Sequence, residues 1–254
     1  MRFAVKRGIL RRTVGHVQAL DRVDLRVLRG ESLVVVGEAD SGKSTLARTV
    51  ARSAPAESGK VLLDGKDLLT LSKSDLRAVE RQVRVLSADS AARAEPLANV
   101  LSAVELGAQL LIFDEPFVAL TDAERARLFS ELRVLQDERA LTYVLLTRHL
   151  GHARGFADEV LVLHAGQIVE SGATATLLTR PLHPYTQALL VAETAAKSGD
   201  PRAAELEARA LTGCRFRARC TYAFSRCARE EPALFVVPGG VSRCFLNDPD
   251  GPGS

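Results

Sequence analysis

Residues 37–45 constrain the fold more than any other part of the chain. Their sequence, GEADSGKST, fits the phosphate-loop pattern G-x-x-x-x-G-K-[S/T]. The apolar run SLVVVG (32–37) before the loop predicts a buried strand, and TLARTVARSA (45–54) after it predicts a helix. In that setting, backbone N–H groups wrap a phosphate chain and the helix N-terminus adds positive potential. We therefore expect a nucleotide-binding fold.

The whole loop is a candidate nucleotide contact. Lys43 is expected to reach the outer phosphates, and the Ser44 hydroxyl is expected to bind Mg²⁺. The nucleotide-binding residues predicted from the loop are Gly37, Glu38, Ala39, Asp40, Ser41, Gly42, Lys43, Ser44 and Thr45.

A second apolar run, LLIFDE (110–115), predicts a companion strand that ends in two carboxylates. Asp114 is expected to hold Mg²⁺ through water, and Glu115 to polarise the water that attacks the outer phosphate. The alternative is an exposed acidic turn, which the phosphate loop makes the weaker interpretation.

Strands and helices alternate along the rest of the core, and this favours the α/β class with a mostly parallel sheet. Predicted strands are VDLRV (23–27), VRVL (83–86), YVLLT (143–147) and EVLVLHAGQIV (159–169). KVLLDGKDL (60–68) predicts a hairpin that turns at Asp64-Gly65. Predicted helices are 74–82 with Ser74 as N-cap, an amphipathic segment that begins at Pro96, and 122–138.

Composition excludes some classes of protein. The 34 Lys and Arg residues nearly balance the 31 Asp and Glu residues, so the net charge of +3 gives no argument for a nucleic-acid partner. Apolar residues make up 46% of the chain, yet no apolar run is long enough to cross a bilayer. The N-terminus lacks a signal-peptide pattern, and we expect a cytoplasmic protein.

Cysteine is confined to the C-terminal part. Residues 1–213 contain none, and the four cysteines are Cys214, Cys220, Cys227 and Cys244. Clustered cysteines in a cytosolic chain favour a metal over disulfides. Four thiolates suit a [4Fe–4S] cluster or tetrahedral zinc, although no C-x-x-C pair is present. Reduced structural thiols remain a third interpretation.

Several stretches together resemble the ATP-binding subunits of ABC importers for oligopeptides, dipeptides and nickel. They are FAVKRGILRRTVGHVQALDRV (3–23), SGKVLLDGKDLL (58–69), LLIFDEP (110–116), FADEVLVLHAGQIVESG (156–172), RPLHPYTQALL (180–190) and the cysteine-containing tail. The likeness covers nearly the whole chain. It implies a P-loop NTPase core of ABC type at residues 1–180, including an antiparallel β subdomain, and a C-terminal region at 181–254.

The resemblance also implies ligands and partners. ATP with Mg²⁺ would bind at the phosphate loop, the adenine would stack on Phe3, and the cysteines would hold an iron–sulfur cluster. Phe3 serves equally well as simple packing. A second ATP-binding subunit and permease subunits are the implied partners, at the inner face of the cell membrane. Glu115 and His149 are the implied catalytic residues.

The chain departs from this family at the motifs that take part in ATP hydrolysis. A helical subdomain with an LSGGQ-type signature normally lies between two core strands, but residues 87–114 leave no room for it, and no LSGGQ occurs. Ser87 stands at the Q-loop glutamine and Thr121 at the D-loop aspartate. The switch histidine is replaced by Arg148 or displaced to His149.

Asp40 stands where the family has a loop glycine. Aspartate adopts positive φ more readily than most residues, so the backbone tolerates it. Its charge beside phosphates is the larger effect, because a unit repulsion at about 4 Å with an effective dielectric near 20 costs around 4 kcal/mol before screening.

We therefore expect the ATP-binding subunit of a peptide-type importer that has lost its helical subdomain, with weak or absent ATP hydrolysis and impaired docking to a permease. The alternative is a non-catalytic nucleotide- or metal-binding regulatory module derived from such a subunit. A third interpretation is a decayed gene product without activity.

Overall fold

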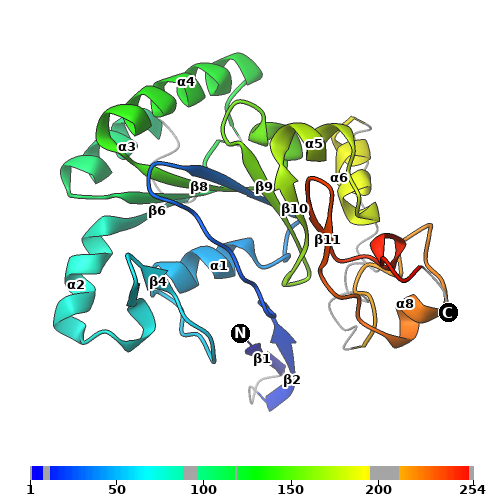
Figure 1. Ribbon diagram of the computed structural model, residues 1–254. Coiled ribbons are helices and arrows are strands. Elements are labelled where there is room, and N and C mark those ends of the chain that lie inside the picture. The colour runs from blue at the N-terminus through cyan, green and yellow to red at the C-terminus, as the bar shows by residue number, and fades with distance from the viewer. Residues whose placement is uncertain (1, 8–11, 88–95, 118, 195–211, 252–254) are drawn as a thin grey trace.

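A mixed eight-stranded sheet forms the centre of the protein. The computed structural model describes residues 2–7, 12–87, 96–117, 119–194 and 212–251, with side chains from residue 19 onward except at 73, 78 and 194. The sheet order is β11-β12-β10-β9-β3-β8-β7-β6 (Figure 1). Its strands are β3 Ser32–Val36, β6 Val83–Ser87, β7 Leu110–Asp114, β8 Thr142–Thr147, β9 Glu159–His164, β10 Gln167–Ala173, β11 Phe235–Val237 and β12 Gly240–Ser242.

The strands from β9 to β6 all pair in parallel, and β10, β12 and β11 extend the sheet by antiparallel pairs. This confirms the expected α/β class with a mostly parallel sheet. The boundary predicted at residue 180 stays a prediction, and β11 and β12 from beyond it belong to the same sheet as the core.

Helices cover both faces of the sheet (Figure 1). They are α1 Lys43–Val50, η1 Leu68–Thr70, α2 Lys73–Gln82, α3 Pro96–Glu105, α4 Asp122–Arg139, η3 Leu150–Ala153, α5 Thr174–Thr179, α6 Pro184–Thr194, α8 Ser225–Arg229 and η4 Phe245–Asn247. Leu33 and Val35 of β3 join the core cluster that includes α1, whereas Val34 and Val36 join the cluster with α3 and α4. Successive side chains of a strand point to opposite faces, so β3 is buried on both.

Two small antiparallel pairs accompany the main sheet. β1 (Arg2–Arg7) pairs with β2 (Arg12–Gln18), and β4 (Leu62–Leu63) pairs with β5 (Lys66–Asp67). The second pair confirms the predicted hairpin, because both turn residues have positive φ, 51° at Asp64 and 78° at Gly65.

Two local predictions were wrong. Residues 23–27 form no strand: Val23 and Val27 pack against the core, whereas Leu25 between them is exposed. A strand also needs a partner for its backbone hydrogen bonds, and the described chain places none beside this segment. The N-cap of α2 is Ser72 rather than Ser74, since the Ser72 hydroxyl accepts the hydrogen bond from the N–H of Asp75.

Residues 88–109 connect β6 to β7, and these two strands are parallel neighbours. β6 pairs with β7 from Val83 opposite Leu110 to Ser87 opposite Asp114. α3 begins at Pro96, as predicted, and buries Val100 and Ala103 in the core. Among the described residues of this connection, α3 leads directly toward β7, and the two strands pair in parallel.

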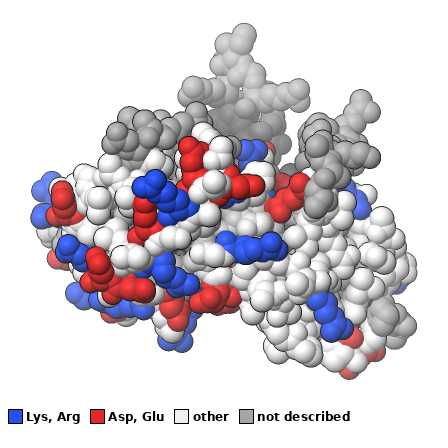
Figure 2. All heavy atoms as spheres, turned by 90° about the horizontal axis from the view of Figure 1, so that it is seen from above, with Lys and Arg blue, Asp and Glu red and all other residues white. Residues whose placement is uncertain are grey.

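Seen from above, the surface carries both signs of charge interspersed rather than in separate areas (Figure 2). On α4, Arg125 pairs with Asp122 and Arg127 pairs with Glu131, one helical turn apart. Exposed pairs at this spacing contribute about 0.3–0.5 kcal/mol each, so α4 depends mainly on its buried face.

Candidate nucleotide-binding site

The phosphate loop connects β3 to α1, as the sequence predicted. Two of its glycines are required by close packing: a Cβ on Gly37 would lie 2.2 Å from the carbonyl oxygen of Leu163, and one on Gly42 would lie 2.5 Å from that of Ala19. Gly42, the N-cap of α1, has a φ of 109°, and Asp40 has a φ of 61°. The positive φ expected of Asp40 is thus confirmed.

Lys43 is buried within the loop that it belongs to, with 5% of its surface exposed. Its ammonium donates to the carbonyl oxygens of Gly37 and Glu38. Burial lowers the pKa of Lys43, and the negative charges of Glu115, Asp114 and Asp40 act in the opposite direction. The ammonium therefore lies against loop carbonyls, with the Glu115 carboxylate 3.8 Å away.

The two residues predicted to hold Mg²⁺ lie together. The Ser44 hydroxyl at the start of α1 donates to Asp114 Oδ1 at the end of β7, at 3.2 Å. A hydroxyl and a carboxylate are the hard oxygen donors that Mg²⁺ prefers. This donor set fits the ion that the sequence predicted.

Glu115 follows Asp114 with an unusual backbone and an unusual side chain. Its φ is 55°, which is costly for a residue other than glycine or asparagine. Glu115 Oε1 lies 3.2 Å from Arg148 Nε and 3.8 Å from Lys43 Nζ. Its Oε2 is buried without a hydrogen-bond partner in the described part of the chain. One oxygen is thus held by two cations, and the other keeps unused capacity to accept a hydrogen bond.

Arg148 and His149 point to different neighbours. Arg148, half exposed at the end of β8, pairs with Glu115. The His149 ring lies 4.9 Å from the ring of His152, whose Nδ1 is 3.0 Å from the Thr147 hydroxyl. Burial lowers the pKa of His152 to about 4, so that ring is neutral. The catalytic role of His149 stays a prediction, and Arg148 was not expected as the partner of Glu115.

The remaining residue predicted to contact nucleotide, Phe3, lies in β1. Its side chain falls outside the described residues, so the stacking on adenine stays a prediction.

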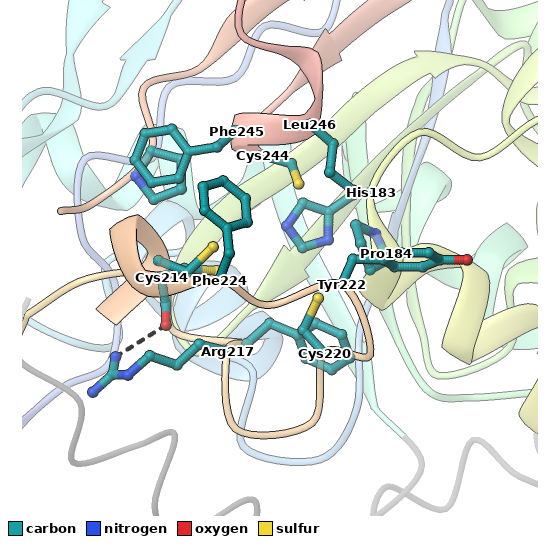
Figure 3. A pocket seen from close by; sticks show the side chains of 13 residues that line it. His183, Pro184, Cys214, Arg217, Cys220, Tyr222, Phe224, Cys244, Phe245 and Leu246 are labelled. Carbon is teal, nitrogen blue, oxygen red and sulfur yellow. Dashed lines mark hydrogen bonds between the residues drawn. The ribbon is translucent and has the colours of Figure 1, made fainter. Parts of the chain in front are cut away.

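All four cysteines line one cavity together with His183 and Phe224 (Figure 3). All four are free thiols. Burial raises the pKa of Cys214 to about 11 and that of Cys244 to about 12. Backbone N–H groups of Phe216 and Leu246 act against this shift by hydrogen bonding to these two sulfurs, which lowers the pKa of each thiol.

The fit of this cavity to a metal centre is incomplete. Its sulfur donors suit a soft metal or a cluster, and N–H groups directed at sulfur favour the thiolate form. Within the described chain, however, no three Cys, His, Asp or Glu residues are grouped as metal ligands. The volume of this cavity that is open to water is about 10 Å³. The cysteine side chains must therefore move to admit a four-iron cluster.

The phosphate loop also contacts the C-terminal region. The backbone N–H of Glu38 donates to the Tyr185 hydroxyl at 2.9 Å, and the Glu38 carboxylate forms an ion pair with Arg219. Arg219 is 181 residues away in sequence. No local pattern could have indicated this contact.

Two family models match the chain. The model described as ABC transporter matches residues 20–97, and the model described as the C-terminal region of oligopeptide/dipeptide transporters matches residues 169–227. The first match thus covers the phosphate loop and ends within α3, and the second covers α6 and three of the four cysteines.

Curated relatives match over most of their length. A probable peptide ABC transporter ATP-binding protein of Sinorhizobium fredii is 28% identical and covers 97% of this chain and 88% of its own. A putative peptide import ATP-binding protein of Brucella abortus is 29% identical, with coverage of 91% and 90%. The first alignment extends over 312 positions, whereas this chain has 254 residues, so that relative carries additional residues between matched segments.

Solved structures share the fold. One is cbiO1 from Clostridium perfringens, part of an ABC transporter complex, with a TM-score of 0.58, 15% identity, and coverage of 80% of this chain and 96% of that one. Another is a dimeric bacterial ABC transporter cassette, with a TM-score of 0.54, 18% identity, and coverage of 63% and 93%. None of the described helices is long and apolar enough to cross a membrane.

Proposed function

Because this chain belongs to the ATP-binding subunits of ABC transporters, in the branch that carries the oligopeptide/dipeptide transporter C-terminal region, we propose that it binds ATP with Mg²⁺ as part of a peptide importer but does not hydrolyse ATP by itself. One observation carries the binding half of the proposal. Lys43, Ser44 and Asp114 converge at the start of α1, where a strand, a loop and a helix meet.

Each residue of the site has a separate task in this proposal. Lys43 leaves the loop carbonyls to contact the outer phosphates, and the N-terminus of α1 adds positive potential. Ser44 and Asp114 hold Mg²⁺, which would neutralise charge on those phosphates. Glu115 supplies the carboxylate that would polarise water, and its Oε2 has no hydrogen-bond partner among the described residues.

The loss of hydrolysis rests on what connects β6 to β7. Residues 88–109 are all that separate the two strands, and 96–105 of these form α3. No LSGGQ sequence occurs in the chain. In the ABC importer family, a groove between the Q-loop and the helical subdomain is the docking surface for a permease. We expect this groove to be missing here.

The partner in this proposal is a second ATP-binding subunit with an intact signature, located with its permease at the inner membrane face. Affinity purification of the tagged chain from its own host, followed by mass spectrometry, tests this. Recovery of another ABC ATP-binding subunit supports an importer subunit. If the chain binds nucleotide but recovers neither a second subunit nor a permease, it acts as a regulatory module outside transport.

Removal of the Asp40 charge is expected to tighten Mg-ATP binding by about tenfold, which corresponds to roughly 1.4 kcal/mol. The side chain is exposed, so solvent and salt reduce the repulsion well below the unscreened value. Asp40→Gly and Asp40→Asn should both tighten binding in a calorimetric titration, because both remove the charge. Tightening by Asp40→Gly alone would assign the effect to backbone freedom, and an unchanged Kd in both would refute the repulsion.

The four cysteines are proposed to bind a metal as thiolates, as a [4Fe–4S] cluster or as zinc. Their shared cavity and the N–H groups directed at Cys214 and Cys244 support this. Anaerobically purified protein is expected to contain either iron with matching sulfide or one zinc per chain. Metal-free protein in which all four thiols are alkylated without loss of stability would contradict the proposal.

A further inference from the structure

Glu38, the second residue of the phosphate loop, is held at all three of its polar groups. Its backbone N–H donates to the Tyr185 hydroxyl at 2.9 Å. Its carboxylate accepts two hydrogen bonds from Arg219, at 2.9 and 2.6 Å. Its carbonyl oxygen accepts from Lys43 Nζ at 2.8 Å. The residue that receives the Lys43 ammonium is therefore anchored from the C-terminal region.

The two anchoring side chains are themselves fixed in place. Tyr185, on α6, is 1% exposed, and its ring lies 5.4 Å from the ring of Phe216. The Arg219 guanidinium lies 5.2 Å from the centroid of the Phe216 ring. A guanidinium that stacks on an aromatic ring and binds a carboxylate with two parallel bonds has little freedom to move.

A second connection reaches the other side of the loop. Arg215 pairs with Asp21 and donates to the carbonyl oxygen of Ala165. The neighbouring Gly166 accepts from the N–H of Asp21 and donates its own N–H to the carbonyl oxygen of Ser41 at 2.8 Å. Residues on both sides of Phe216 thus connect to the loop, one through Glu38 and one through Ser41.

From these contacts we propose that Arg219 and Tyr185 are positioning residues of the nucleotide site, which set the conformation of the phosphate loop through Glu38. This proposal rests on the proposed function, in which the loop binds Mg-ATP. The C-terminal region then completes the nucleotide site, in addition to packing against the core.

The physical reason is preorganisation. A phosphate loop binds through backbone N–H groups whose directions must be set before the ligand arrives, and a loop that must be ordered on binding loses affinity. Two anchors at Glu38 hold the first turn of the loop and the carbonyl that Lys43 contacts. Their removal leaves Lys43 and the Mg²⁺ ligands chemically intact but frees the backbone around them.

Four variants separate positioning from folding. Arg219→Ala removes the pair with Glu38, and Tyr185→Phe removes only the hydroxyl that accepts from the Glu38 N–H. Arg219→Glu combined with Glu38→Arg reverses the pair. Arg217→Ala is the matched control, because Arg217 lies two residues away and donates to the carbonyl oxygens of Thr212 and Cys214, within its own segment.

The measurement is the Kd for Mg-ATP by calorimetry, with the thermal midpoint of each variant measured in parallel. Arg219→Ala is expected to weaken binding about tenfold and Tyr185→Phe about threefold, in line with a charge-assisted and a neutral hydrogen bond. The reversed pair should recover most of the lost affinity, and Arg217→Ala should match the wild type.

Equal Kd values for the wild type, Arg219→Ala and Tyr185→Phe would overturn the inference while leaving nucleotide binding in place. A drop in thermal midpoint that the reversed pair restores, without any change in Kd, would assign the contact to stability alone and would overturn it as well. If the wild type itself fails to bind Mg-ATP, the proposed function fails, and this inference fails with it.

Discussion

Purified alone, the protein is expected to release phosphate from ATP at a rate that the Glu115→Gln variant does not change. In the ABC importer family that this chain resembles, the phosphate loop of one subunit faces the signature helix of the other. The N–H groups and the positive end of that helix stabilise charge on the outer phosphate. Two copies of this chain would supply no signature to either site. Removal of one such electrostatic element commonly costs 10²–10³ in rate, or about 3–4 kcal/mol.

The surroundings of Glu115 add to this expectation. Its Oε1 is held by Arg148 at 3.2 Å and by Lys43 at 3.8 Å. These contacts engage one oxygen of the carboxylate with cations rather than with an attacking water. The ring of His149 lies beside His152. In a heterodimer, an intact partner subunit would supply its signature to the site at Lys43 and Glu115 of this chain. The second site, at the partner's phosphate loop, would have no signature.

The test compares phosphate release by the wild type, by Glu115→Gln and by a sample without protein. Three indistinguishable rates agree with the expectation. Turnover by the wild type that disappears in Glu115→Gln would show that this chain hydrolyses ATP without an LSGGQ sequence, and the proposed loss of hydrolysis would have to be abandoned.

The core strands could be predicted from the sequence because they are strongly apolar and bounded by residues typical of turns. The runs at 32–37, 110–113 and 143–147 are buried strands because their residues suit both faces of a covered sheet. The phosphate loop could be predicted as well, because its motif is a short contiguous pattern of two glycines and Lys43.

Failures of prediction occur where partners are distant in sequence. Alternation at 23–27 correctly indicated that Val23 and Val27 face the core but not that Leu25 is exposed, and whether a segment becomes a strand depends on a neighbour that alternation does not encode. β11 and β12 were not predicted, because three-residue strands carry too little periodicity.

In the site, sequence reasoning identified the residues of the loop and of β7 but not their more distant partners. A signal for Arg148 was present: it directly follows a strand that neighbours β7, and parallel neighbours end at the same edge of a sheet, next to Glu115. No such signal exists for Arg219, which reaches Glu38 only because the cysteine-containing segment packs against α6.

Replacement of Lys43 with alanine is expected to abolish ATP binding, with a loss of at least about a hundredfold in affinity. The ammonium is the one cation placed inside the loop among the described residues, and a hydrogen bond to a charged group contributes about 1.5–3 kcal/mol before phosphate charge is counted. Lys60→Ala is the control, because Lys60 is exposed and lies outside the loop.

The most direct test of the account is a calorimetric titration of ATP into the wild type and Lys43→Ala, each with and without Mg²⁺. The account predicts one saturable site in the wild type that Mg²⁺ tightens, because Ser44 and Asp114 are positioned to hold the ion, and no measurable site in Lys43→Ala. Absence of binding by the wild type, or equal binding by both proteins, would contradict the claim that this loop is a working nucleotide site.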